Sequence, residues 1–287
     1  MYYLQATGRK EGMDAVIIIA GNRVNSVSEP LTPLEQYIVS EKLKSPQPFS
    51  YESEDQLKFE LRMRTKIVEA AEEMYASRVK FGDFPKSQSN PAYWIRMPNG
   101  GFQLRPGVRS SDAIRDIWLN SEMYTFECAT AIIMMMYKAV LETIGAPLFD
   151  TYFQNLVLYT WTTDEDLRII TKPGYESFPG DVLYFKNPDV NPATPEWQGE
   201  NVIELGNNLF FGHGMGIKTP IEVIQELNAY RRPFAFRSAF LMHQVTAPDY
   251  KYLYQLSKSV PASTYTDITM PFRGIISRIG EFTVVAS

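Results

Sequence analysis

The chain contains one cysteine and two histidines, so few pairs of a nucleophile and a base are open to it. Cys128 begins a long apolar segment that we expect to be a helix. The dipole and the free N–H groups of a helix N-terminus favour a thiolate, and the same groups can hold an oxyanion. Cys128 is therefore a candidate nucleophile for acyl transfer, and a buried structural cysteine is the alternative interpretation.

His213 is the better candidate for the base that a cysteine nucleophile needs. It lies in residues 211–217, FGHGMGI, where the flanking glycines allow another backbone or a substrate to approach the imidazole. The second histidine, His243, follows the apolar residues 240–242 and is interpreted as a structural histidine beside the core.

Glu200 is the candidate partner for His213. Residues 201–205 and 209–217 have the character of strands, and the Gly-Asn-Asn between them predicts a hairpin. Pairing outward from this turn brings Glu200 opposite residue 213, 214 or 215, within reach of the imidazole across a diagonal. A solvated carboxylate at a strand end is the alternative. Glu127, beside Cys128, is a second candidate, as a charge at the helix start or as a substitute partner.

The elements that must position these residues form helices first and short strands later, which predicts an α+β fold. The central helix, 126–144, is apolar nearly all round, so we place it in the core, packed on a mostly antiparallel sheet. Short strands are expected from residue 156 onward. The other expected elements are helices at about 32–43, 53–77 and 110–119, one that starts at Thr219, a hairpin of 93–97 with 102–105, and possible strands at Ala15 to Ala20 and Phe282 to Ala286.

The composition narrows the class of protein. A chain of 287 residues, 45% hydrophobic and with a net charge of −5, is typical of a soluble globular protein and shows no basic stripe for nucleic acid. No apolar run is long enough for a membrane span or a signal core. A single cysteine forms no intramolecular disulfide, which fits a reducing compartment. Metal-binding and phosphate-loop spacings are missing, so we expect no metal and no cofactor.

Four separated blocks resemble the small transglutaminase of bacterial spore coats. They are residues 126–131 (FECATA), 180–188 (GDVLYFKNP), 197–203 (WQGENVI) and 213–217 (HGMGI), in the same order as in that family. The resemblance runs from about residue 30 to about residue 255. It implies one transglutaminase domain over residues 1–287, with extensions of unknown role before about residue 20 and after about residue 255.

The resemblance implies a papain-like core and an enzyme that joins a glutamine side chain to a lysine amine without calcium. The family's cysteine, glutamate and histidine correspond to Cys128, Glu200 and His213, and its partly substituting glutamate corresponds to Glu127. The implied partners are spore coat proteins that bear reactive glutamine and lysine side chains. The implied location is the cytoplasm of the mother cell, then the spore coat.

In the implied reaction the Cys128 thiolate forms a thioester and a lysine amine resolves it, while His213 moves protons and Glu200 orients the imidazole. Water competes with the amine, whose pKa is about 10.4 when free, so the site must exclude water. Trp197 and Trp161 are candidate walls, or simple core aromatics. The rival functions are a papain-like peptidase or amidase that cuts peptide or cell-wall amides, and a non-catalytic coat scaffold.

Overall fold

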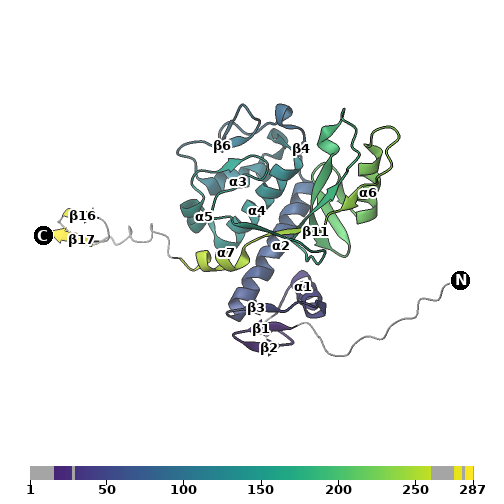
Figure 1. Ribbon diagram of the computed structural model, residues 1–287. Coiled ribbons are helices and arrows are strands. Elements are labelled where there is room, and N and C mark those ends of the chain that lie inside the picture. The colour runs from purple at the N-terminus through teal and green to yellow at the C-terminus, as the bar shows by residue number, and fades with distance from the viewer. Residues whose placement is uncertain (1–15, 28–29, 260–274, 280–281, 287) are drawn as a thin grey trace.

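The computed structural model describes residues 16–27, 30–259, 275–279 and 282–286. At its centre two helices, α2 (Glu54–Ala76) and α4 (Cys128–Ile144), pack side by side (Figure 1). Both helices contact β11 (Gly199–Gly206), an inner strand of a seven-stranded sheet. Nearly every side chain of α4 up to Leu141 is buried, so the predicted core helix is confirmed.

The sheet that carries the other candidate residues is antiparallel throughout. Its strands follow the order β13-β12-β11-β10-β15-β9, and β14 pairs with β10 beside β15. This mixture of helices with an antiparallel sheet confirms the predicted α+β class. The strands are β9 (Ile169–Lys172), β10 (Val182–Lys186), β12 (Leu209–Gly212), β13 (Gly216–Lys218), β14 (Phe240–Leu241) and β15 (Val245–Pro248).

The two faces of the sheet bury different apolar clusters because side chains alternate along each strand. Val182 and Ile203 pack with α2 and α4, whereas Leu183 and Val202 pack with α6 (Pro220–Ala229). Figure 1 shows α6 beyond the sheet, away from α2 and α4. The sheet therefore lies between two layers of helices. Helix α4 lies on the face that carries Val182 and Ile203.

A smaller unit at the N-terminal end of α2 contains β1 (Ile17–Ile19), β2 (Asn22–Val24), β3 (Phe49–Tyr51) and α1 (Pro33–Lys44) (Figure 1). It has its own apolar cluster, centred on Ile38 and Leu57. Strand β1 confirms the expected strand near the N-terminus; Ala15 itself lies outside the described residues.

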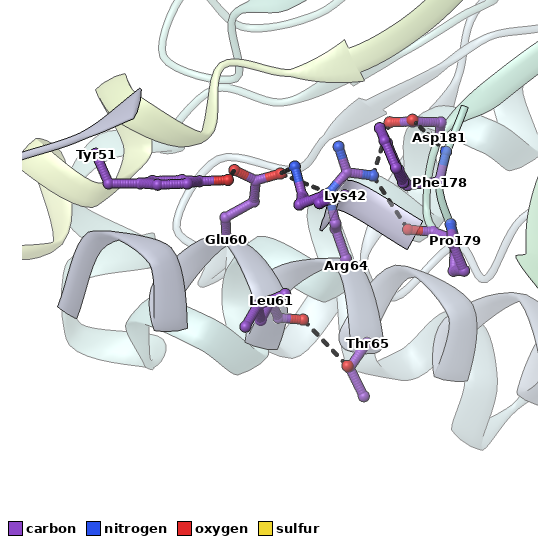
Figure 2. A network of polar contacts seen from close by, with 9 residues as sticks. All are labelled: Lys42, Tyr51, Glu60, Leu61, Arg64, Thr65, Phe178, Pro179 and Asp181. Atoms are coloured by element: carbon purple, nitrogen blue, oxygen red, sulfur yellow. Dashed lines mark hydrogen bonds and ion pairs between the residues drawn. The ribbon is translucent and has the colours of Figure 1, made fainter. Parts of the chain in front are cut away.

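A buried ion network joins this unit to the sheet (Figure 2). Glu60 accepts from Lys42 at 2.9 Å, from Arg64 at 2.7 Å and from the Tyr51 hydroxyl at 2.9 Å. Arg64 also donates to Asp181, just before β10, at 2.9 Å. Two cations and two carboxylates thus neutralise one another in the interior, which buried charges require.

Side chains at the first residues of the predicted helices cap most of these helices. Thr32 and Thr219 form full capping boxes at α1 and α6. Ser53 caps α2, but the Gln56 side chain accepts from the backbone of Glu52 instead of completing the box. Ser110 is the first residue of its helix rather than the cap, and its hydroxyl donates to Asp150.

The remaining elements surround the core. The predicted hairpin of 93–97 with 102–105 is confirmed as an antiparallel pair, and Phe282–Ala286 forms a strand as predicted. No helix in the described ranges is both long and apolar enough to cross a bilayer. These elements are α3 (Ser110–Leu119), α5 (Ala146–Tyr152), α7 (Tyr250–Ser257), β4 (Lys80–Phe81), β5 (Trp94–Arg96), β6 (Phe102–Leu104), β7 (Thr125–Phe126), β8 (Val157–Leu158), β16 (Ile275–Ile279), β17 (Phe282–Ala286) and short 3-10 helices at Phe84–Lys86, Ser121–Met123 and Pro195–Trp197.

The predicted continuous strand over 209–217 is wrong in its middle. Strand β12 ends at Gly212, residues 213–215 form a turn, and β13 starts at Gly216. Gly214 and Gly216 have φ of 109° and 80°, a region that glycine adopts without steric cost and that a strand does not use. The glycines therefore turn the chain at His213 as well as leaving space beside it.

Candidate active site

Cys128 is the first residue of α4, as predicted. Strand β7 pairs in parallel with β4 and leads the chain directly into the helix, with Glu127 as its N-cap. The thiol is half-buried and lines a cavity of about 710 Å³. The only cysteine of the chain thus faces an open cavity large enough for an amino-acid side chain.

Glu127 acts as the helix-start charge, one of its two predicted roles. Its carboxylate accepts from the N–H of Ala129 at 2.6 Å, from the N–H of Thr130 at 2.7 Å and from the Thr130 hydroxyl at 2.5 Å. The N-cap side chain satisfies the donors that a helix start otherwise leaves open. Those two N–H groups are therefore not available to hold an oxyanion, contrary to our expectation.

The Cys128 thiol has two polar neighbours from strand β11. The amide nitrogen of Asn201 lies 3.7 Å from the sulfur, and the carboxylate of Glu200 lies close enough to the thiol for each group to affect the pKa of the other. Burial raises the pKa of the thiol well above its ordinary value, and the Glu200 and Glu127 carboxylates raise it further, against the lowering effect of Asn201. The expectation that the helix start favours the thiolate is wrong for the resting site, since burial and two carboxylates outweigh it.

Glu200 is buried, with 1% of its surface exposed. Burial raises the pKa of its carboxyl, and the nearby charges of Glu127 and Glu226 act in the same direction. A Cβ added to Gly212 would lie 2.8 Å from its Oε1, so the carboxylate sits directly over the backbone of Gly212. Oε1 has no hydrogen-bond partner among the described residues. A carboxylate with a raised pKa beside a thiol is suited to take that thiol's proton.

His213 is buried in the turn between β12 and β13, with 5% of its surface exposed. Its ring lies 5.0 Å from the ring of Phe126 and 5.9 Å from that of Phe81, between centroids. Burial lowers the pKa of the imidazole to about 4, although the backbone carbonyls of Lys80 and Phe126 oppose this shift. The imidazole is therefore neutral at physiological pH.

The structure brings Glu200 and His213 to neighbouring positions on the hairpin. The pairing of β11 with β12 ends at Val202 opposite Gly212, so Glu200 lies two residues beyond the last pair on one strand and His213 one residue beyond it on the other. The predicted pairing of Glu200 with residue 213, 214 or 215 does not form, because those residues turn away from the strand. Nε2 of His213, like Oε1 of Glu200, has no hydrogen-bond partner in the described part of the chain. The Glu200 carboxylate and the Cys128 thiol affect each other's pKa, and the backbone carbonyls of Lys80 and Phe126 raise the pKa of the imidazole against the effect of burial.

Aromatic rings form one side of the site. Phe81 lies 5.6 Å from Trp197 between ring centroids, and Trp197 stacks on Tyr230 at 4.2 Å with an angle of 5°. Trp161 lines the cavity from the opposite segment and is 39% exposed. Trp197 thus packs behind Phe81 without lining the cavity, whereas Trp161 lines the cavity directly.

Two further placements complete the site. His243 is exposed, and its ring lies 4.4 Å from that of Tyr175, so the structure does not bring it to Cys128. Asn201 touches the sulfur but was not predicted, although it follows Glu200 in a predicted strand. It lies in the block 197–203, but its uncharged amide gave no reason to assign it a role, so only the packing of β11 against α4 reveals its contact with the sulfur.

The arrangement brings together a thiol in a cavity, a carboxylate that affects the pKa of that thiol, and a neutral imidazole, which are the kinds of group that acyl transfer requires. Across the residues that the structure describes, no three His, Cys, Asp or Glu side chains gather in a group that could hold a metal ion.

Comparison with known proteins gives consistent results. The model of the family described as Protein-glutamine gamma-glutamyltransferase matches residues 16–257. A Protein-glutamine gamma-glutamyltransferase of Bacillus cereus (strain G9842) is 44% identical over 258 residues, which cover 90% of this chain and 94% of the relative. One from Bacillus anthracis (strain CDC 684 / NRRL 3495) has the same identity and coverage. A solved structure, the transglutaminase from Geobacillus stearothermophilus without its C-terminal extension, aligns with a TM-score of 0.69 and 50% identity, covering 72% of this chain and 100% of its own.

Proposed function

The chain belongs to the protein-glutamine gamma-glutamyltransferase family and is a transglutaminase, and we propose that it crosslinks proteins of the bacterial spore coat through a thioester on Cys128. The observation that supports the mechanism is that the Glu200 carboxylate and the Cys128 thiol, which lines the cavity, are close enough to affect each other's pKa. The four blocks that resemble the spore-coat enzyme support the choice of substrates.

The first half-reaction transfers the acyl group of a substrate glutamine to Cys128. As the sulfur–carbon bond forms, the thiol proton moves to Glu200. The carbon–nitrogen bond then breaks, and the same proton joins the departing nitrogen, which leaves as ammonia. Because burial raises the pKa of Glu200, this carboxylate binds the proton better than an ordinary one would.

His213 stabilises the protonated form of Glu200 in the interval between attack by the thiol and departure of ammonia. Oε1 of an ionised Glu200 and Nε2 of a neutral His213 are both acceptors, so they cannot pair at rest. Once Glu200 carries the thiol proton, its O–H can donate to Nε2. In this assignment the imidazole positions the protonated carboxyl, and Glu127 contributes the cap and a negative charge.

The second half-reaction transfers the acyl group to lysine. The amine attacks the thioester, its nitrogen loses a proton to Glu200, and the sulfur leaves and regains that proton. The product is an ε-(γ-glutamyl)lysine isopeptide bond. A lysine amine is mostly protonated in water, with a pKa of about 10.4, so a cavity that removes its hydration favours the reactive form. We assign Trp161 and Trp197, with its neighbour Phe81, to shielding the thioester from water.

The test follows a labelled primary amine into a glutamine-bearing protein. Cys128→Ala should abolish incorporation, and isopeptide mapping by mass spectrometry with spore coat proteins should locate glutamine–lysine crosslinks. Incorporation that survives the substitution contradicts the mechanism. Peptide fragments in place of high-mass ladders indicate a hydrolase, and crosslinks absent from coat proteins contradict the substrate assignment. No calcium is required in this proposal, so a chelator should leave the rate unchanged.

A further inference from the structure

The oxyanion formed by attack on a carboxamide needs hydrogen-bond donors, and the ordinary ones at this helix start are occupied. The N–H groups of Ala129 and Thr130 both donate to Glu127. The Asn201 amide is directed at the sulfur. In the described part of the chain, the backbone N–H of Cys128 itself remains as a donor without a partner. A second donor must come from another element.

Tyr184 is placed to supply it. In strand β10 it pairs directly with Asn201 of β11, so the two side chains project from the same face of the sheet. Val182, two residues earlier on that face, packs in the cluster that contains α4. Tyr184 therefore projects toward the helix start where Asn201 touches Cys128, and it lines the same cavity as the thiol.

Gly199 leaves the space that the tyrosine hydroxyl occupies. It lies two residues before Asn201, diagonal to Tyr184 on the same face, and a Cβ there would overlap the hydroxyl oxygen. The hydroxyl has no hydrogen-bond partner within the described residues. Burial raises the pKa of Tyr184, and the charges of Cys128 and Glu200 raise it further, so the hydroxyl stays protonated as a donor.

We propose that the Tyr184 hydroxyl, together with the backbone N–H of Cys128, donates a hydrogen bond to the oxyanion of each tetrahedral intermediate. This proposal rests on the proposed acyl transfer to Cys128. As the sulfur–carbon bond forms, the carbonyl π electrons move to oxygen, and the two donors hold that charge. When the carbon–nitrogen bond breaks, the electrons return to the carbonyl. No proton leaves Tyr184 in either half-reaction, so its role is electrostatic.

The test compares acyl transfer with simple alkylation in Tyr184→Phe. Removal of one oxyanion donor lowers kcat by about 10²–10³-fold in other enzymes, so we expect a loss of that order with KM within about threefold of wild type. Alkylation of Cys128 by iodoacetamide is displacement at a saturated carbon and forms no oxyanion. Its rate should therefore stay within about twofold of wild type.

Each outcome of the comparison decides the assignment. A parallel loss of alkylation shows that Tyr184 acts through the thiol and overturns the proposal, as does unchanged kcat. Tyr175→Phe, an exposed tyrosine that lines a different cavity, is the matched control. Tyr184→Phe removes only a hydroxyl that has no hydrogen-bond partner among the described residues. Its thermal unfolding midpoint should therefore match that of wild type, which confirms that the variant folds. If wild type itself lacks Cys128-dependent incorporation, the proposed function fails, whatever Tyr184→Phe does.

Discussion

The carboxylate of Glu200 lies so close to Gly212 that a Cβ on residue 212 would stand 2.8 Å from its Oε1. Two strands of one hairpin thus place the acid beside the residue that precedes His213. The absence of a side chain at position 212 decides where the carboxylate sits, and the first prediction follows from it.

Gly212→Ala should displace the Glu200 carboxylate from the thiol and lower amine incorporation by about tenfold or more, since a misplacement of this size commonly costs up to 10² in rate. The fold should persist because φ of residue 212 is not positive. A double-mutant cycle supplies the control. In a Glu200→Ala background the same glycine substitution should cost little more, and full additivity of the two losses would contradict this explanation.

Glu200→Gln should change two rates in opposite directions. The Glu200 charge raises the pKa of Cys128, so its removal lowers that pKa and increases the thiolate fraction, by about tenfold for each pKa unit. Alkylation by iodoacetamide at neutral pH should therefore become faster, while amine incorporation falls because the proton acceptor is lost. Timed assays of alkylation and of amine incorporation, made on the same preparations of wild type and Glu200→Gln, measure both rates. Slower alkylation in the variant would show that Glu200 activates the thiol at rest.

Burial of His213 should make the protein less stable in acid. The unfolded chain protonates this histidine near pH 6.5, whereas the folded protein resists protonation down to about pH 4. Between these values the unfolded state binds more protons, so the free energy of unfolding falls by about 1.4 kcal/mol for each pH unit of acidification. Above pH 6.5 the histidine makes no such contribution.

Urea unfolding of wild type and His213→Gln across this pH range measures the effect. The difference between the two curves should change by about 3 kcal/mol between the ends of the window, with wild type the more acid-sensitive. His243→Gln removes an exposed histidine outside the cavity and serves as the control. Parallel curves for wild type and His213→Gln would contradict the burial argument.

Glu60→Ala should destabilise the fold by about 3–5 kcal/mol, because it leaves the buried Lys42 without its counter-charge (Figure 2). The pKa of Glu60 is lowered to about 2, chiefly by Lys42 and Arg64 against the effect of burial, so its carboxylate remains charged through the physiological range. Glu41→Ala breaks the exposed pair with Lys44 and should cost less than about 1 kcal/mol. Chemical unfolding measures the free energy of unfolding of both variants. Similar losses in Glu60→Ala and Glu41→Ala would contradict the distinction between the buried and the exposed ion pair.

The sequence by itself determined the local features of the protein. The single Cys128 limits the nucleophile to one position, and the apolar run after it predicts the buried helix. Threonine caps with a proline behind them start α1 and α6 where expected. These signals act between residues a few positions apart, so the hydrogen bonds that they report form in any fold that keeps the segment.

Only the tertiary structure decided the pKa values of the site residues and which side chains lie beside the thiol. Residue spacing placed Glu200 near His213, but the packing of β11 against α4 brought it, with Asn201, to the thiol. The raised pKa of Cys128 reverses what the helix start alone would give, because burial depends on distant segments that exclude water. Tyr184 belongs to the same category, since only strand register places its hydroxyl over Gly199 and beside the nucleophile.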